Sequence, residues 1–342
     1  MSEVIFLLIL IINIPIVIFY KKITKIICIN DSADNIRKLH QTDIPLFGGI
    51  LITFNIIIFS ILDFFVNLNL INELYSTREY FSFYLGIILY FLLGIFDDKF
   101  DLSANKKLLL NIFILIILIF LDDNLVIKQL NFSFLENPIE LRNFSYAFTI
   151  LCILLFSNAL NMFDGINLQT ATYCLIIFMI FIFKDVFFLI SIILICVLIL
   201  FLFYNIFNRM FLGDSGTYVL SFLISYILIK SHNIEQKFDP EEIFIILSLP
   251  GLDMFRLFLL RIWKGKSPFN SDRNHIHHLI LKKFSSFQTF LIIQLFIISN
   301  LLVFYFFDNK LNVLFINISS YLILFLYFLF NYFFLGLWCR CS

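Results

Sequence analysis

Long apolar runs recur along almost the whole 342-residue chain and constrain its fold more than any other feature. Each run is about as long as a helix that crosses a bilayer, where only helices and closed barrels satisfy all their backbone hydrogen bonds. Hydrophobic residues make up 61% of the chain and charged residues 14%, against roughly 45–50% and about 25% in soluble domains. The sequence therefore predicts an all-α polytopic membrane protein and excludes a soluble or secreted domain.

We expect about eleven transmembrane helices in a single integral membrane domain that occupies residues 1–342, because no repeat or change of composition marks a second domain. The apolar windows lie near 3–20, 44–66, 80–96, 107–121, 145–160, 171–183, 186–207, 216–230, 242–262, 287–307 and 313–338. The first window lacks the basic start and small-residue cleavage site of a signal peptide, which indicates a transmembrane helix. Residues 122–145 alternate partly between apolar and polar and predict a short strand or hairpin.

Basic residues indicate how these helices are oriented. With eleven spans, 17 of the 24 Lys and Arg residues fall on one side of the membrane and 7 on the other. The side richer in Lys and Arg is normally the cytoplasmic one. We therefore expect the N-terminus outside and the C-terminus in the cytoplasm.

Four polar segments interrupt the apolar pattern. They read DDKFDLSANKK at 97–107, NALNMFDGIN at 158–167, FLGDSG at 211–216 and SPFNSDRNHIHH at 267–278. Polar groups at membrane depth are costly unless they have a function. Because all four segments are cytoplasmic in the expected topology, the sequence predicts one active site at the cytoplasmic face of the membrane.

The first two segments carry side chains that suit a divalent cation. Asp97 and Asp98 are adjacent and repel each other, so holding both ionised requires a cation or lysines nearby. Asn158, Asn161 and Asp164 are spaced three apart, which puts neighbouring members on one helix surface. Oxygen ligands of this kind suit Mg²⁺, which keeps phosphate oxygens among its ligands.

The other two segments suit a phosphate group. Asp214 lies between glycines just before an apolar helix, where the backbone can approach a phosphate and the carboxylate can bind its metal. The last segment holds a cluster of donors that is typical of an anion clamp: Arg273, His275, His277 and His278. The same histidines with Asp272 leave a zinc site as an alternative.

Simpler interpretations exist for each feature alone. Asp97 and Asp98 could form a solvated loop, NxxN a pair of helix-packing amides, and GDSG a turn or an N-cap. Asp253 and Arg256, three residues apart in the ninth window, indicate an intramembrane ion pair. Most of the six cysteines lie in or beside apolar runs and indicate packing residues, whereas acylation or metal binding stays open for Cys339 and Cys341.

Taken together, the segments resemble the polyprenyl-phosphate N-acetylhexosamine-1-phosphate transferases, glycosyltransferase family 4. This family includes the WecA-like UDP-GlcNAc:undecaprenyl-phosphate transferases and the MraY-type peptidoglycan translocases. The resemblance lies within residues 31–283, and the matching segments occur in family order: RKLHQTDIPLFGG at 37–49, DDKFDLS at 97–103, NALNMFDGIN, FLGDSG, PGLDMFRLFLLR at 250–261 and SPFNSDRNHIHH. The RNHIHH loop and eleven spans favour the WecA-like branch over an MraY-type enzyme.

The resemblance implies a phosphoryl-group exchange at the bacterial inner (cytoplasmic) membrane. A polyprenyl phosphate, undecaprenyl phosphate in a bacterium, would attack the β-phosphorus of a UDP-N-acetylhexosamine, with UDP-GlcNAc the expected donor. The products would be UMP and a lipid-linked first sugar of a cell-surface glycan such as an O-antigen. Mg²⁺, or Mn²⁺ in its place, is the implied cofactor. No nucleic-acid partner is expected, and a homodimer stays open.

The resemblance also implies roles for the candidate residues. Asp214 would bind Mg²⁺, with Asn161 as a second ligand. Asp97 and Asp98 would lie beside the lipid phosphate, and Lys107, or Lys106 because the register is loose, would contact phosphate. Asp164 would lie near the nucleotide and the metal with Asn158 beside it, and the last loop would grip the diphosphate or sugar.

This chain departs from the family pattern at a few positions. Relatives commonly continue after NMFDGIN with Gly and Leu, where this chain has Leu168 and Gln169, and Ala104 replaces a frequent Pro. These departures affect expected substrate contacts more than the proposed ligands. A transporter, with a path lined by Asp and Arg, remains the alternative of another class, but it would need polar residues in both halves of the membrane.

Overall fold

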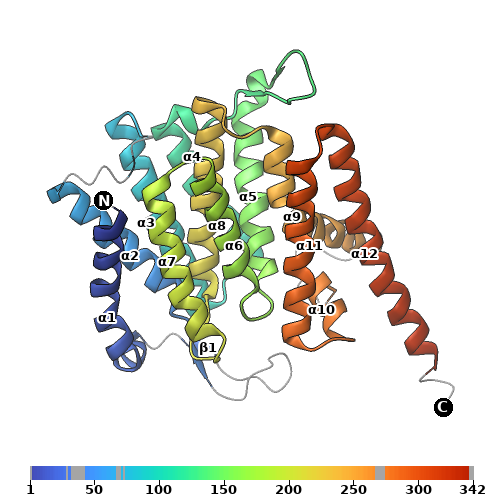
Figure 1. The fold of residues 1–342 in the computed structure, drawn as a ribbon, viewed down its shortest axis with the longest axis horizontal. Coiled ribbons are helices and arrows are strands. Elements are labelled where there is room, and N and C mark those ends of the chain that lie inside the picture. The colour runs from blue at the N-terminus through green and yellow to red at the C-terminus, as the bar shows by residue number, and fades with distance from the viewer. Residues whose placement is uncertain are drawn as a thin grey trace.

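The computed structural model describes residues 2–27, 30–31, 43–66, 71, 74–265 and 274–338 as a helical bundle (Figure 1). Eleven of the helices in these ranges have at least 15 residues. They are α1 (Ser2–Ile27), α2 (Gly48–Val66), α3 (Thr77–Phe100), α4 (Ala104–Leu121), α5 (Ser145–Phe163), α6 (Gln169–Phe183), α7 (Phe188–Asn205), α8 (Gly213–Lys230), α9 (Pro240–Trp263), α11 (Ser286–Phe306) and α12 (Lys310–Trp338). The short α10 (Ile276–Leu281) precedes α11.

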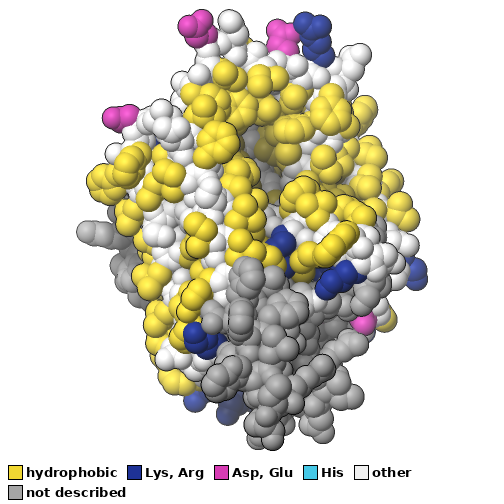
Figure 2. Space-filling view, turned by 90° about the vertical axis from the view of Figure 1, so that its right-hand side faces the viewer, with side chains coloured by type: hydrophobic (Ala, Val, Ile, Leu, Met, Phe, Trp, Pro, Cys, Tyr) yellow, Lys and Arg dark blue, Asp and Glu magenta, His cyan; other side chains and the backbone are white. Residues whose placement is uncertain are grey.

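The predicted all-α polytopic fold is confirmed. Eight helices of the described part are long and apolar enough to cross a membrane, and α6 is a shorter apolar helix. The eleven long helices coincide with the eleven predicted windows, while the number that span the bilayer stays a prediction. Large apolar side chains point outward along the bundle, as Phe64, Phe120 and Phe183 do at more than 80% exposure. Figure 2 shows such side chains covering much of one face, as a lipid-facing surface requires.

Strands are short and lie in the connections. β1 (Asn30–Asp31) pairs antiparallel with β2 (Ile44–Pro45) near the lower end of Figure 1. β3 (Gln129–Leu130) pairs antiparallel with β4 (Ile139–Glu140) at the opposite end, which confirms the hairpin predicted within 122–145. Short helical turns lie at Asp123–Leu125, Arg142–Phe144 and Ser231–Glu235.

Helix α8 forms the centre of the bundle. Every residue from Ser215 to Lys230 is buried, and α2, α3 and α5 pack against this helix. Because α8 is surrounded by protein, it can carry Ser, Thr and charged residues that a lipid-facing helix could not. This composition explains why α8 is absent from the helices that qualify as spans by length and apolarity.

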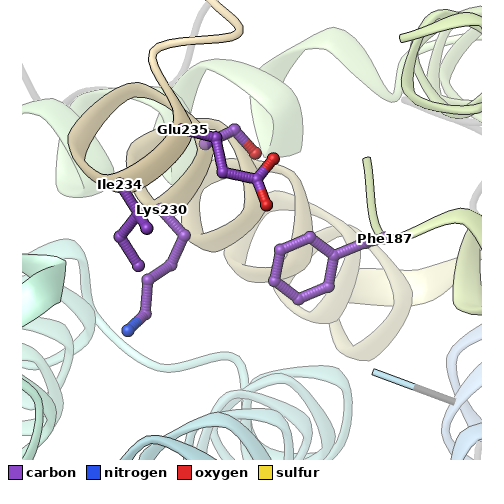
Figure 3. Close-up of a pocket in the computed structure, with 5 residues that line it drawn as sticks. Phe187, Lys230, Ile234 and Glu235 are labelled. Carbon is purple, nitrogen blue, oxygen red and sulfur yellow. The ribbon is translucent and has the colours of Figure 1, made fainter. Parts of the chain in front are cut away.

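The C-terminal end of α8 carries a buried charge. Lys230 Nζ lies 3.0 Å from Glu79 Oε2 and 2.9 Å from Asp122 Oδ1, and the Tyr226 hydroxyl donates to Asp122 Oδ2 at 2.9 Å. A small pocket beside Lys230 is lined by Phe187, Lys230, Ser231, Ile234 and Glu235, and the Lys230 ammonium group points away from the Phe187 ring (Figure 3). This cluster was not predicted from the sequence, and it lies at the opposite end of α8 from the first turn that carries Asp214.

The N-terminal end of α8 is held by the chain around it. The N–H groups of Gly48 and Gly49 donate to the carbonyl oxygens of Phe211 and Leu212, both at 3.0 Å. On the other side, α3 approaches so closely that a Cβ atom at Gly94 would overlap the backbone of Ser215. The start of α8 therefore has little freedom to move between α2 and α3.

We expect Gly94→Ala to lower the free energy of unfolding by about 1–3 kcal/mol, because an extra methyl group in a packed contact forces the backbone to shift. The measurement is the unfolding temperature of the purified protein in detergent. Gly251→Ala is the matched control, since nothing lies within 4 Å of a Cβ atom at that position. Equal unfolding temperatures for the two variants would contradict the close packing of α3 on α8.

Candidate active site

Three of the predicted polar segments meet around the first turn of α8. The end of α3 brings Asp97 and Asp98, the start of α4 brings Lys107, and the end of α5 brings Asn161, all toward Asp214. The sequence separates these residues by as much as 117 positions, so only the packing of α3, α4 and α5 against α8 brings them together. The fourth segment reaches the same region through its histidines.

Lys107 lies between two acidic side chains. Its Nζ atom is 2.6 Å from Asp97 Oδ2 and 3.8 Å from Asp214 Oδ2. Asp97 is only 3% exposed, and its other carboxylate oxygen accepts the Leu102 N–H at 3.1 Å. Lys106 is exposed. Of the two candidate lysines, Lys107 is therefore the one that pairs with Asp97 and Asp214.

Asp98, unlike its neighbour Asp97, accepts hydrogen bonds from the backbone at the start of α8. Its two carboxylate oxygens accept the backbone N–H groups of Asp214 at 2.7 Å and Ser215 at 3.1 Å. The first N–H groups of a helix have no partner within the helix and carry partial positive charge. Asp98 therefore stabilises the helix end that carries Asp214, which is a more structural role than the expected contact with a lipid phosphate.

Asn161 orients Asp214 from the α5 side. Its Nδ2 atom donates to Asp214 Oδ1 at 2.6 Å and to Thr217 Oγ1 at 3.1 Å. The amide oxygen of Asn161 makes neither of these contacts. Asn158 lies one turn earlier and donates to the Leu154 carbonyl of its own helix at 2.9 Å. Thr217 was not predicted to belong to the site. Its position one turn after Asp214 on α8 was the signal in the sequence that could have indicated it.

Asp164 and Gly165 form the turn that follows α5. Asp164 is exposed, yet the surrounding protein and the carboxylates of Asp214 and Asp98 raise its pKa above the ordinary Asp value. A Cβ atom at Gly165 would overlap the imidazole ring of His277. The glycine therefore lets the histidine segment pack directly against the turn that carries Asp164.

The three histidines form one cluster of rings. The ring centroids of His275 and His277 are 5.4 Å apart and stacked, and those of His277 and His278 are 4.3 Å apart. His277 is buried, and burial together with repulsion from His278 and His275 lowers its pKa to about 3. Its ring is therefore neutral at pH 7. Arg273, predicted to belong to this cluster, lies outside the described residues, as do Asp272, Arg37, Lys38 and His40.

A buried carboxylate in α9 fastens this cluster. Asp253 was predicted to form an ion pair with Arg256, and Arg256 Nη2 does lie 2.6 Å from Asp253 Oδ1. Asp253 also contacts His275 Nδ1 at 3.1 Å and accepts the Ile276 N–H at 3.2 Å. The contact between Asp253 and His275 was not predicted. An acidic residue within an apolar helix was the available signal, but the ion pair with Arg256 already explained its presence.

The departure at residue 168 has a backbone consequence. Leu168 adopts φ 69°, in the left-handed region that favours Gly. Its N–H donates to Asn205 Oδ1 at 2.7 Å, and Asn205 Nδ2 donates to the Met210 carbonyl at 2.8 Å. Asn205 thus ties the turn after α5 to the loop before α8 and maintains a conformation that glycine would adopt without strain.

The donor set at the start of α8 fits a magnesium ion. Among the described residues no three His, Cys, Asp or Glu side chains converge as a complete metal cage. Mg²⁺ does not need one, because it commonly uses one or two carboxylates together with waters and substrate phosphates. The Asp214 side chain is 32% exposed and the Asn161 amide group contacts it, so the Asp214 carboxylate, with the Asn161 amide oxygen turned toward the ion, could hold the metal.

The chain is similar in sequence to a known family and to several known proteins. Residues 80–232 match the family model described as glycosyl transferase family 4. The undecaprenyl-phosphate alpha-N-acetylglucosaminyl 1-phosphate transferase of Escherichia coli O157:H7 is 29% identical over 298 residues, which cover 81% of this chain and 76% of the relative. The protein of the same name from Escherichia coli K12 is 28% identical with the same coverage. A probable undecaprenyl-phosphate N-acetylglucosaminyl 1-phosphate transferase of Bacillus subtilis is 28% identical over a region that covers 72% of this chain and 68% of the relative.

Replacing Lys107 with Met should destabilise the protein, because it leaves the buried Asp97 carboxylate without its counter-charge. Breaking a fully buried pair typically costs roughly 3–5 kcal/mol; we expect about 2 kcal/mol here, because the Lys107 side chain keeps contact with solvent. The measurement is the unfolding temperature in detergent at pH 7. Lys106→Met is the neighbouring control and should be neutral, and Asp97→Asn combined with Lys107→Met should recover part of the loss.

Proposed function

We propose that this chain, which matches the glycosyl transferase family 4 model over residues 80–232, transfers GlcNAc-1-phosphate from UDP-GlcNAc to undecaprenyl phosphate and releases UMP. In this reaction an oxygen of the lipid phosphate forms a bond to the β-phosphorus of the nucleotide sugar. The bond from that phosphorus to the bridging oxygen breaks, and the bridging oxygen leaves as part of UMP. The product is a lipid-linked diphospho-sugar.

The observation that carries this proposal is the group formed by Asp97, Lys107, Asp214 and Asn161 at the start of α8. Little covalent chemistry is required of a protein that catalyses phosphoryl transfer, which depends on positioning and on neutralising negative charge. Lys107 supplies a fixed positive charge.

We assign each side chain a role that follows from its position. Asp214 and the Asn161 amide oxygen would hold Mg²⁺, or Mn²⁺ in its place, which neutralises phosphate charge during transfer. Lys107 would contact a phosphate oxygen beside Asp97. Asp98 would keep the start of α8 in place, and Asp164 would face the nucleotide end of the donor.

The histidines would contact the diphosphate or the sugar. His277 is neutral in the absence of substrate, so it would act through a ring N–H rather than as a fixed cation. Arg273 keeps its proposed place in this loop. The names of the relatives favour GlcNAc-1-phosphate over the larger donor of an MraY-type enzyme.

The transporter alternative is not supported by the buried charges at the far end of α8. The buried charges at the far end of α8 are satisfied by one another, because Lys230 contacts both Glu79 and Asp122. They do extend polar groups into the other half of the bundle, contrary to the expectation that such groups collect on one side. A closed ion-pair cluster, however, lines no path across the membrane.

We place the protein in the bacterial cytoplasmic membrane with the site facing the cytoplasm. In a cysteine-free background, a cysteine at Glu136 in the β3–β4 loop should react with a membrane-impermeant maleimide added to intact cells that lack an outer membrane barrier. A cysteine at Lys282, beside α10, should react only after permeabilisation. The opposite pattern would reverse the proposed orientation.

The activity is tested with purified protein, undecaprenyl phosphate, Mg²⁺ and a panel of UDP-N-acetylhexosamines, with UMP release as the readout. We expect UMP from UDP-GlcNAc, and none after chelation or without the lipid. Asp214→Asn and Asn161→Ala should each reduce turnover, by about 100-fold or more for Asp214. Folded variants that keep full Mg²⁺-dependent turnover would remove these residues from the metal site.

A further inference from the structure

Asp253 has more partners than an ion pair requires. Its Oδ1 atom accepts from Arg256 Nη2 at 2.6 Å and from the Tyr321 hydroxyl of α12 at 3.1 Å. Its Oδ2 atom lies 3.1 Å from His275 Nδ1, and the Ile276 N–H lies within 3.3 Å of both oxygens. Asp253 is 4% exposed, so each of these hydrogen bonds is shielded from competing water.

This contact determines how the His275 ring is protonated and oriented. A carboxylate paired with Arg256 only accepts hydrogen bonds, so His275 Nδ1 carries a proton and donates it. The other ring nitrogen, Nε2, is then the one available to a ligand. The His275 ring stacks on His277 with an angle of 7° between the planes, and the His277 ring packs on Gly165 beside Asp164.

Arg256 and Tyr321 complete the attachment of the histidine segment. Arg256 Nη2 donates to the Asn274 carbonyl at 2.7 Å, and Arg256 Nε donates to the Tyr321 hydroxyl at 3.1 Å. Residues 274 to 276, which lead into α10, are therefore all hydrogen-bonded to side chains of α9. Pro250 lies inside α9 just before Asp253, and the C-terminal part of α9 runs behind α12 in Figure 1.

We infer that Asp253 is a positioning residue for sugar-nucleotide binding, which holds His275 with Nε2 free for the donor diphosphate and ties this ring through Tyr321 to α12. The inference rests on the proposed function, since the donor is the ligand that the histidines would bind. It gives α12, which carries none of the four polar segments, a part in forming the site. A purely structural ion pair between Asp253 and Arg256 would not require the bond to His275.

The two interpretations differ in the kinetics that they predict. A positioning role makes the effect of Asp253 depend on His275 and restricts it to the nucleotide sugar. A structural role lowers the amount of folded enzyme, so the maximal rate falls while the KM values for both substrates stay unchanged. A double-mutant cycle separates the two, because residues that act through one another are not additive.

We would measure UMP release for wild type, Asp253→Asn, His275→Ala and the double variant, with each substrate varied in turn. Asp253→Asn should raise the KM for UDP-GlcNAc about tenfold, in the range of roughly 10–100-fold typical of residues that orient a functional histidine. The KM for undecaprenyl phosphate should not change. The double variant should be no worse than His275→Ala alone.

Asp122→Asn is the matched control, because Asp122 is another buried, ion-paired carboxylate, 2% exposed, at the far end of the bundle. It should lower the unfolding temperature without changing either KM. If Asp253→Asn does not fold, Tyr321→Phe removes a single donor to Asp253 and should raise the same KM about twofold to fivefold, an effect of the size of one hydrogen bond.

The outcomes separate this inference from the proposed function. Absence of UMP release by the wild type would overturn the proposed function. A wild type that is active, together with an unchanged KM for UDP-GlcNAc in Asp253→Asn, would overturn the positioning role alone. Additive losses in the double variant would do the same, since they would show that Asp253 does not act through His275.

Discussion

The start of α8 is the constraint on which the rest of the site depends. Helix α8 is enclosed by protein along its length, and its first N–H groups need partners that neither lipid nor the helix itself can supply. Asp98 provides them through two hydrogen bonds. Because Asp98 follows Asp97 at the end of α3, the same contact fixes the position of Asp214 relative to Asp97 and Lys107.

The two ends of α8 use buried charge in different ways. At the C-terminal end, Lys230 is 1% exposed and its two carboxylate partners are buried with it, which closes the cluster to ligands. At the N-terminal end, Asp214 stays 32% exposed and Lys107 24% exposed. A charged pair gains little from remaining partly solvated, so stability does not account for this opening, whereas access for the charged substrates of the proposed reaction would.

The helices and most candidate residues could be predicted because they depend on local properties of the chain. The apolar windows predicted the eleven long helices within a few residues of their observed ends, except that α1 continues beyond its window to Ile27. Burial in lipid imposes length and composition directly. The sequence also placed a lysine near the acidic pair, although only the structure distinguishes Lys107 from Lys106. The ion pair of Asp253 with Arg256 was predicted and is confirmed. The contacts of Asp98 with the start of α8 and of Asp253 with His275 and Tyr321 could not be predicted, because they join segments distant in sequence.

The sequence by itself determined that this chain is a helical membrane protein and which polar residues interrupt its apolar helices. Only the tertiary structure decided that Asp98 caps α8, that Asn161 orients Asp214 and that Asp253 holds His275. The physical reason is that hydropathy and helix length act along a single segment and leave their mark in its composition. A hydrogen bond between two helices depends on their relative rotation and distance, which the packing of side chains around α8 settles and no single segment encodes.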